Sequence, residues 1–408
     1  MNQKKILNDP VYGFVDLPYG ILFSLIEHPY FQRLRRIKQT SLTHYVYPGA
    51  LHTRFHHAIG ALHLMQQAIE VLRSKGTAIT DAEAEGACIA ILLHDIGHGP
   101  FSHTLEHTLI QVAHEDLSLL FMERLNEVFP GKLGLAMEIF RGRYPKKFLT
   151  QLVSGQLDMD RMDYLNRDSF FTGVHEGVIG YDRIIKMLAV RDDELVVEEK
   201  GIYSIEKFLI ARRLMYWQVY LHKTVLSAEQ MLIATLRRAI VLVQGGTELP
   251  ASRALRFFLR EQPALEAFAG QQRDKLLEQY AALDDFDVIS ALKEWMSSGD
   301  KLLAFLSGSL VNRRLYRLEF RHQPFDEGYE ASLRERILAW SGLEEWALPY
   351  LMLKGQESNA AYTTSKNEIR ILHKNGQVLP MSQSTDYDLQ SKEVTKYYLC
   401  YPKVIFTE

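Results

Sequence analysis

The stretch ILLHDIGHGPFSHTLEH, residues 91–107, decides the fold, because it places a cluster of titratable groups directly behind an apolar run. It holds four histidines, one aspartate and one glutamate within seventeen residues. Burying His94 and Asp95 at the end of an apolar helix costs several kcal/mol unless another group compensates them. The rest of the chain indicates which group that is.

Composition bounds the class of protein. The 408 residues are 47% hydrophobic, which fits a globular chain with one large core or two to three domains. A formal net charge of −3 gives no overall basic bias toward nucleic acid. Two cysteines cannot build a disulfide framework. Because the first residues have no signal-peptide core and every apolar run is too short for a membrane span, we expect a cytoplasmic protein.

Apolar residues recur at three- and four-residue spacing over most of the chain, which predicts helices. The predicted helical stretches are residues 57–72, 85–95, 117–129, 205–223 and 227–243. Residues 188–205 predict a strand pair that turns at Asp192–Asp193. Charged helices are expected up to about residue 356, and strands with a hairpin turn at Asn375–Gly376 after it. We expect a mainly α fold, with a helical domain over 1–240 that carries a small β-hairpin, and a smaller α+β region over 241–408.

His57 stands at the head of an apolar stripe on its predicted helix. The stripe continues through Ala61, Leu64, Met65, Ala68 and Leu72. His56 belongs to a polar stripe instead, so we expect His57 to point into the core and His56 toward water. An isolated histidine on an apolar face is more often a hydrogen-bonded core residue than a ligand.

His94 and Asp95 lie where the next predicted helix ends, because Gly97, Gly99 and Pro100 follow at once. Their side chains should therefore be buried but open at one end. For this pair alone, a buried His–Asp hydrogen bond explains the sequence as well.

Residues 154–170 supply four aspartates within eleven residues. Asp160 shares a helical face with Tyr164, whereas Asp163 and Arg167 are spaced for an i,i+4 ion pair, which we expect on a solvated surface. Two imidazoles and two carboxylates suit a divalent transition metal with open positions for water and substrate. Its charge would compensate the buried carboxylates.

The order His57, His94–Asp95, Asp160 resembles the H…HD…D signature of the HD phosphohydrolases. The segments at 31–60, 94–103, 114–116 and 158–168 resemble more closely the deoxynucleoside triphosphate triphosphohydrolase branch. That branch includes bacterial dNTPases and the animal enzyme that joins a sterile-alpha-motif to an HD domain. The resemblance is strong from about Asn8 to Lys223 and implies an HD-domain helical core.

The resemblance implies a divalent metal ion, such as Mn, Fe, Zn, Ni or Mg. Its implied ligands are His57, His94, Asp95 and Asp160. The implied reaction is attack of water on the α-phosphorus of a dNTP, which releases a deoxynucleoside and intact triphosphate. The implied catalytic residues are His103, Glu106, His114 and Glu115.

Glu106 lies three residues after His103 and can orient its imidazole, so His103 is the predicted general acid. In one unbroken helix His103 and His114 would lie about 16 Å apart. If both serve the site, the chain must turn between about Leu109 and His114.

The resemblance also implies a set of residues that contact the phosphates and the sugar of the substrate. The set is Gln39, Arg54, His98, Arg161, Tyr164, Asp168, Arg212 and Tyr220. Tyr220 is implied to lie against the 2′ carbon of the deoxyribose, braced by Tyr216 and Trp217. For Arg161 and Arg212 the alternative is a surface ion pair.

Family members form dimers or tetramers, and some bind an activating nucleotide at a subunit interface. Asn8, Gln32 and Arg35 match that interface site, whereas Glu27 replaces an aspartate. The resemblance therefore implies dNTPs as substrates, a homo-oligomer and a possible nucleotide activator.

Two other functions stay open. The first is a different HD phosphohydrolase, which acts on another nucleotide or on a phosphomonoester. The second is an inactive scaffold that binds nucleotide or nucleic acid. Tyr164, Asp168 and Tyr220 argue against the first, since they match positions that read the sugar. The four intact ligand positions argue against the second.

Overall fold

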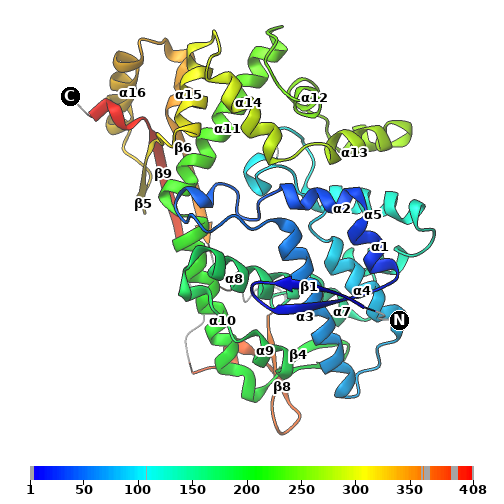
Figure 1. The fold of residues 1–408 in the computed structure, drawn as a ribbon. Coiled ribbons are helices and arrows are strands. Elements are labelled where there is room, and N and C mark those ends of the chain that lie inside the picture. The colour runs from blue at the N-terminus through cyan, green and yellow to red at the C-terminus, as the bar shows by residue number, and fades with distance from the viewer. Residues whose placement is uncertain (1–3, 107, 360–361, 363–367, 387–393, 407–408) are drawn as a thin grey trace.

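The computed structural model describes residues 4–106, 108–359, 362, 368–386 and 394–406. Helices make up most of the molecule (Figure 1), which confirms the mainly α fold class. The helices are α1 Ile21–Glu27, α2 Pro29–Gln32, α3 Arg54–Ser74, α4 Asp81–Leu93, α5 His114–Val128, α6 Gly134–Phe140, α7 Lys147–Val153, α8 Met159–Thr172, α9 Tyr181–Met187, α10 Ile202–Met215, α11 Lys223–Gln244, α12 Arg253–Glu261, α13 Arg273–Ala281, α14 Asp285–Trp295, α15 Lys301–Val311, α16 Glu327–Ser341 and α17 Leu348–Leu351.

Short strands form three small sheets. The strands are β1 Lys4–Asp9, β2 Gly13–Pro18, β3 Leu188–Arg191, β4 Glu194–Glu198, β5 Arg317–Arg321, β6 Leu353–Asn359, β7 Arg370–Leu372, β8 Val378–Pro380 and β9 Val394–Tyr401. Their orders are β1-β2, β3-β4-β7-β8 and β5-β9-β6. β5 lies in a region that the sequence predicts as helical; its antiparallel pairing with β9 supplies the ladder that a five-residue segment lacks alone.

Both predicted hairpins are present. Asp192 and Asp193 adopt left-handed backbone angles, with φ of 51° and 59°, as a two-residue turn between twisted strands requires. Gly376 likewise has a φ of 85° between β7 and β8. β4 pairs with β7 in parallel, so the β7–β8 hairpin extends the β3–β4 hairpin into a four-stranded sheet.

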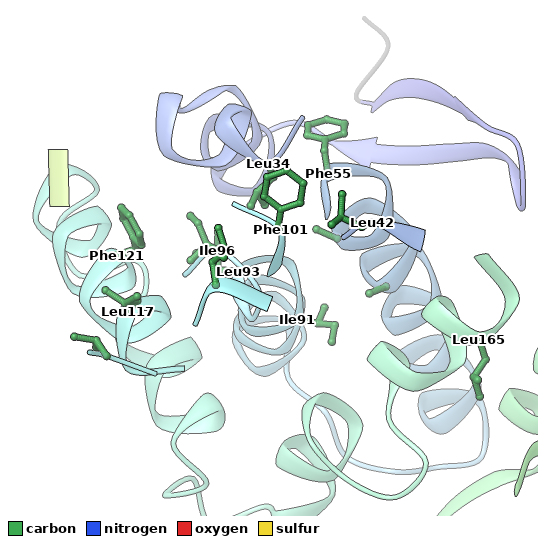
Figure 2. Packing of buried hydrophobic residues seen from close by; sticks show 14 of the residues in the cluster. Leu34, Leu42, Phe55, Ile91, Leu93, Ile96, Phe101, Leu117, Phe121 and Leu165 are labelled. Atoms are coloured by element: carbon green, nitrogen blue, oxygen red, sulfur yellow. The ribbon is translucent and has the colours of Figure 1, made fainter. Parts of the chain in front are cut away.

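The helices α3, α4 and α8 hold the core of the site. His57 is fully buried on α3, as its apolar stripe predicts, and the ring of half-buried His56 accepts a hydrogen bond from Thr53 N at 3.1 Å. Thr80 and Glu83 cap α4 reciprocally, and that helix ends at Leu93, directly before His94. Figure 2 shows Phe55, Ile91 and Leu165 of α3, α4 and α8 among the buried side chains of the same core.

One predicted helix is interrupted. The periodicity predicts a helix over 205–223, but α10 stops at Met215 and a single π turn follows, with Leu221 N bonded to Tyr216 O at 2.7 Å. His222 then caps α11 through Thr224 N. Such turns are frequent at functional sites, because they rotate the side chains that follow.

α11 runs from the part of the molecule that holds α8 and α10 to the part that holds α12 and α15 (Figure 1). The predicted domain boundary at residue 240 falls within this helix. The division of the chain into a domain over 1–240 and a region over 241–408 stays a prediction. No helix of the described residues is long and apolar enough to cross a membrane.

Gly60 is the residue on α3 that lets α8 approach. A Cβ there would overlap Asp163 Oδ1 and Arg167 Nη2, both of which are fully buried. Overpacking a core in this way typically costs about 1–3 kcal/mol. We therefore expect Gly60→Ala to lower the free energy of unfolding by about that amount, measured by urea denaturation.

Gly134→Ala is the matched control, because Gly134 begins α6 and a Cβ there meets open space. Alanine has the higher helix propensity, so this variant should keep or raise stability. Equal unfolding midpoints for Gly60→Ala and the wild type would contradict the tight approach of the two helices.

Candidate metal centre and the adjoining cavity

Four predicted ligands converge where α3, the end of α4 and the start of α8 meet. His57 Nε2 lies 3.3 Å from His94 Nε2 and 3.1 Å from Asp160 Oδ1. His94 Nε2 lies 3.5 Å from the same carboxylate oxygen. Asp95 completes the set, with its oxygens 3.6 Å from His57 Nε2 and 3.4 Å from His94 Nε2. His57, His94 and Asp160 therefore face one point, and Asp95, which forms an ion pair with Arg54, lies beside it.

A second polar layer lies behind His57. Its Nδ1 donates to Asp163 Oδ2 at 2.7 Å, and the same carboxylate accepts two hydrogen bonds from Arg167, each at 2.9 Å. Arg167 in turn donates to Asp9 at 2.8 Å. The expectation that Asp163 lies on a solvated face is wrong, although its pair with Arg167 forms. The pair is buried because Gly60 of α3 has no side chain, which leaves room for both side chains between the two helices.

The hydrogen bonds of the two histidines indicate that a cation fits between them. His94 Nδ1 donates to Ile91 O at 2.6 Å and His57 Nδ1 donates to Asp163, so each neutral ring turns a lone pair on Nε2 toward the other. Two lone pairs 3.3 Å apart repel each other unless a proton or a metal ion lies between them. A set of two imidazoles and two carboxylates suits a divalent metal.

The pKa shifts of the site residues also favour a bound cation. Burial would lower the pKa of His57, but Asp160 and Asp163 outweigh it and raise the pKa to about 10. Burial opposes ionisation of Asp95, and the Arg54 guanidinium holds the pKa of that carboxyl well below its usual value. The pocket therefore attracts positive charge, which a divalent ion supplies when it displaces the protons.

Three further histidines form a cluster beside this centre. The ring centroids of His98 and His114 lie 3.9 Å apart, and those of His103 and His114 lie 4.9 Å apart. Glu106 connects the last two, since its oxygens lie 3.0 Å from His103 Nδ1 and 3.0 Å from His114 Nδ1. Burial opposes ionisation of Glu106, but these hydrogen bonds hold its pKa well below the usual range.

The chain turns before His114, as the joint use of His103 and His114 requires. A short 3-10 helix, Ser102–Leu105, ends at Glu106, and α5 begins at His114. Phe101 and Ser102 have left-handed φ values of 56° and 54°, which is uncommon for residues other than glycine. Such local strain persists where the surrounding structure holds it in place.

The C-terminal half of the chain supplies part of that support. Asp285 accepts hydrogen bonds from Phe101 N at 2.8 Å and Lys38 N at 2.9 Å. Tyr280 donates to Gly97 O at 2.9 Å. Neither residue carries a sequence signal that points to the site, because the contacts span 183 to 247 residues of chain.

Three tyrosines, Tyr164, Tyr216 and Tyr220, form an aromatic wall beside the metal centre. Tyr220 donates to Asp168 Oδ2 at 2.7 Å, and Asp168 Oδ1 lies 2.6 Å from Nε2 of buried His52. Tyr216 and Tyr164 contact the Tyr220 ring edge-on, with centroids 5.4 and 6.1 Å away. Tyr216 therefore braces Tyr220 as predicted.

The other predicted brace, Trp217, lies under the ammonium group of Lys396, 3.8 Å from the ring centroid. His52 was missed altogether. The spacing of LHTRFHH, residues 51–57, offered a signal, since it places a histidine just before the cap of α3.

One cavity of about 690 Å³ joins the metal centre, the histidine cluster and the aromatic wall. The predicted residues that line it are Gln39, Arg54, Asp95, His98, His103, Glu106, His114, Asp160, Arg161, Tyr164, Asp168, Arg212 and Tyr220. His57 and His94 lie behind this lining. Glu115 does not line the cavity, and 61% of its side chain is exposed.

The predicted polar groups at the cavity differ in how they are held. Arg161 forms an ion pair with Asp158, and Arg212 donates to Gln156 at 3.3 Å, so both are paired yet face the cavity. Gln39 Oε1 is buried without a hydrogen-bond partner. Tyr216, predicted as a brace of Tyr220, also lines the cavity. The sequence did not point to the remaining lining residues, which are Thr40, Ser41, Thr43, Ser102, Thr104, Thr108, Leu221, Leu226, Glu229, Gln230, Ile233, Arg237 and Glu357.

Comparison with known proteins identifies the family. A model of the HD domain matches residues 54–168, and a model of the HD associated region matches residues 179–255. The fold superposes on the crystal structure of a phosphohydrolase from Bacteroides thetaiotaomicron VPI-5482 with a TM-score of 0.94. The two sequences are 51% identical, and the match covers 98% of this chain and 99% of the other. This chain is an HD-domain phosphohydrolase.

Other relatives are more distant. The uncharacterized protein YwfO of Bacillus subtilis is 30% identical over 99% of this chain and 93% of its own length. The deoxynucleoside triphosphate triphosphohydrolase SAMHD1 of Homo sapiens is 31% identical over 55% of this chain and 42% of its own length. A SAMHD1 homolog from Dictyostelium discoideum is 33% identical over 56% and 48%. This phosphohydrolase therefore spans less than half of both SAMHD1 proteins.

The HD-domain match begins at Arg54 and ends at Asp168, so it encloses the four predicted ligands. The HD associated region contributes Arg212 and Tyr220 to the same cavity. An HD phosphohydrolase depends on a divalent metal, and His57, His94 and Asp160 form the candidate cluster.

We expect Asp160→Asn to abolish metal binding. The change removes the charge that faces both Nε2 atoms and leaves two imidazoles with one remaining carboxylate. Protein expressed with Mn²⁺ and dialysed should carry roughly one ion per chain as wild type and almost none as the variant, measured by plasma mass spectrometry.

Asp163→Asn should have a graded effect. The amide still accepts from His57 Nδ1 but no longer makes that ring more basic, and loss of such an outer hydrogen bond typically costs about 10–100-fold in metal affinity. Asp182→Asn, on the exposed face of α9, is the matched control. Full metal content in Asp160→Asn would exclude this centre.

Proposed function

We propose that the protein hydrolyses deoxynucleoside triphosphates to a deoxynucleoside and intact triphosphate. One observation carries the proposal: the cavity brings a metal centre, a cationic lining and an aromatic wall that carries Asp168 into one space. A phosphomonoesterase whose substrate carries no sugar needs the first two features but has no use for the third. The names of the SAMHD1 relatives support the same substrate class.

The cavity lining carries several groups that can bind phosphate. Arg54, Arg161 and Arg212 line the cavity together with the cluster of His98, His103 and His114. Guanidinium groups recognise phosphate oxygens through paired hydrogen bonds, and they align the α-phosphate for attack. A divalent ion at the candidate centre would polarise the phosphate and activate a water molecule.

His103 is placed to finish the reaction. Its Nδ1 is held by Glu106, and its Nε2 lies 3.5 Å from His98 Nε2 at the cavity, where a bound substrate can accept its proton. When water attacks the α-phosphorus, the bond from that phosphorus to the 5′ oxygen breaks. The oxygen takes the Nε2 proton and leaves as the 5′-hydroxyl of the deoxynucleoside, while the attacking oxygen remains on the triphosphate. Glu106 orients the His103 imidazole for this step through the contact with its Nδ1.

The sugar end is rigid. Asp168 is held from two sides, by His52 and by Tyr220, so its carboxylate offers a fixed acceptor for the 3′-hydroxyl. The Tyr220 ring, braced by Tyr216 and Tyr164, occupies the space that a 2′-hydroxyl would need. A homo-oligomer, a nucleotide activator and a role for Glu115 stay predictions from the family resemblance.

Product analysis tests this function. Purified enzyme with Mn²⁺ or Mg²⁺ is incubated with each of the four dNTPs, and the products are separated by ion-exchange chromatography. We expect equal amounts of deoxynucleoside and triphosphate. Monophosphate and pyrophosphate, or release of inorganic phosphate from a monoester alone, would assign a different HD phosphohydrolase.

Sugar discrimination tests the role of Tyr220. We expect kcat/KM for dGTP to exceed that for GTP by roughly a hundredfold, the rejection that an apolar wall gives to an added hydroxyl. Tyr220→Ala should reduce this ratio, because it opens the space beside the 2′ carbon. Both substrates are assayed under identical conditions.

Tyr220→Phe is the matched control, since it keeps the ring and removes only the hydrogen bond to Asp168. It should retain most of the preference. If Tyr220 only stabilises the core, Tyr220→Ala will lower the unfolding temperature while the dGTP/GTP ratio stays unchanged.

A further inference from the structure

The β1–β2 hairpin places one carboxylate in the interior of the molecule. Most residues of β1 are exposed, but Asp9 at the end of that strand is buried. Asp9 Oδ1 accepts hydrogen bonds from Val11 N at 2.9 Å and from Tyr12 N at 3.1 Å, which shape the hairpin turn. Asp9 Oδ2 accepts a hydrogen bond from Arg167 Nη1 at 2.8 Å. One oxygen therefore holds the turn, while the other contacts the core.

Arg167 connects this carboxylate with the metal centre. It is fully buried on α8, and two carboxylates, those of Asp9 and Asp163, share its guanidinium group. Asp163 accepts two hydrogen bonds from Arg167, each at 2.9 Å, and a third from His57 Nδ1 at 2.7 Å. The Tyr12 ring of the hairpin lies 5.5 Å from the guanidinium carbon, in range of a cation–π contact. The hairpin therefore holds Arg167 with a carboxylate and with an aromatic ring.

The balance of charges gives Asp9 a role beyond the hairpin turn. Asp163 and Arg167 alone would form a neutral pair, which has little effect on the basicity of His57. Asp9 adds a second negative charge to the one positive charge of Arg167. All three groups are buried, and buried charges act on one another more strongly than charges in water. Asp163 thereby keeps the negative charge that makes His57 a stronger metal ligand.

We propose that Asp9 is a positioning residue for His57 in the candidate metal centre. It acts through the two residues that lie between them, Arg167 and Asp163. Such coupling is reciprocal, so a bound metal ion also strengthens the contact between Asp9 and Arg167 and stabilises the hairpin turn. This inference concerns the metal centre and is independent of which phosphate ester the protein hydrolyses.

The affinity for the metal alone tests the role of Asp9. Full-length protein freed of metal with a chelator is titrated with Mn²⁺, and the free ion is measured by electron paramagnetic resonance. Asp9→Asn keeps an oxygen for the turn and removes the charge, so it should bind Mn²⁺ roughly three- to tenfold more weakly than the wild type. Asp16→Asn is the matched control, because Asp16 lies on β2 of the same hairpin with 54% of its side chain exposed. It should bind Mn²⁺ as the wild type does.

A double-mutant cycle tests the route from Asp9 to His57. If Asp9 acts through Asp163, Asp9→Asn should have little further effect on Mn²⁺ affinity in the Asp163→Asn background. A residue that only stabilises the fold would weaken binding by the same factor in both backgrounds. Circular dichroism checks that each variant is folded. Equal losses in the two backgrounds, or wild-type affinity in Asp9→Asn, overturn the proposal.

Hydrogen exchange of the wild type tests the reverse direction and requires no substitution. The amides of Val11 and Tyr12 donate to Asp9, so their exchange reports on the hairpin turn. With Mn²⁺ bound, they should exchange roughly three- to tenfold more slowly, measured by mass spectrometry, while α16 is unchanged. Unchanged exchange in the hairpin overturns the coupling. If the coupling is found but no dNTP yields triphosphate, the role of Asp9 stands and the proposed hydrolysis is wrong.

Discussion

Charge compensation around the carboxylates at the junction of α3, α4 and α8 is the constraint on which the site depends. A buried carboxylate requires a partner, and two of them have an arginine: Asp95 pairs with Arg54, and Asp163 with Arg167. Asp160 is different, because its close partners are the Nε2 atoms of two histidines whose Nδ1 atoms are already committed to donation. The protein thus pairs Asp95 and Asp163 with arginines and leaves Asp160 facing two imidazoles, which favours a cation between them.

The remainder of the site depends on elements far away in the chain. The segment between His94 and His114 folds back on itself, and its left-handed residues, Phe101 and Ser102, lie at the start of a 3-10 helix of only four residues. Tyr280 and Asp285 from the C-terminal half bond to its backbone, as does Arg33. The helical core therefore fixes the metal ligands, whereas the C-terminal half helps to fix the histidines that face the phosphates.

The sequence predicted the features that depend on local periodicity. His57 was predicted to be buried because its stripe repeats every 3.6 residues, and the turn at Asp192–Asp193 because two-residue hairpins favour such residues. Asp163 and Arg167 were misassigned because an i,i+4 pair has the same pattern on a surface and in a core. Gly60, on another helix, decides between the two, and no local pattern connects it with α8. The pairing of β4 with β7 and the contact of Asp285 with Phe101 are likewise products of tertiary packing.

The metal centre and the sugar wall are carried by the same helix, and this arrangement has a mechanistic consequence. Asp160, near the start of α8, faces the Nε2 atoms of His57 and His94, while Asp168, two turns further along α8, holds Tyr220. Because one helix carries both aspartates, helix geometry fixes the spacing between the metal centre and the wall. In the proposed reaction a sugar held at Asp168 therefore sets where the α-phosphorus lies relative to the metal centre, without any movement of one element past another.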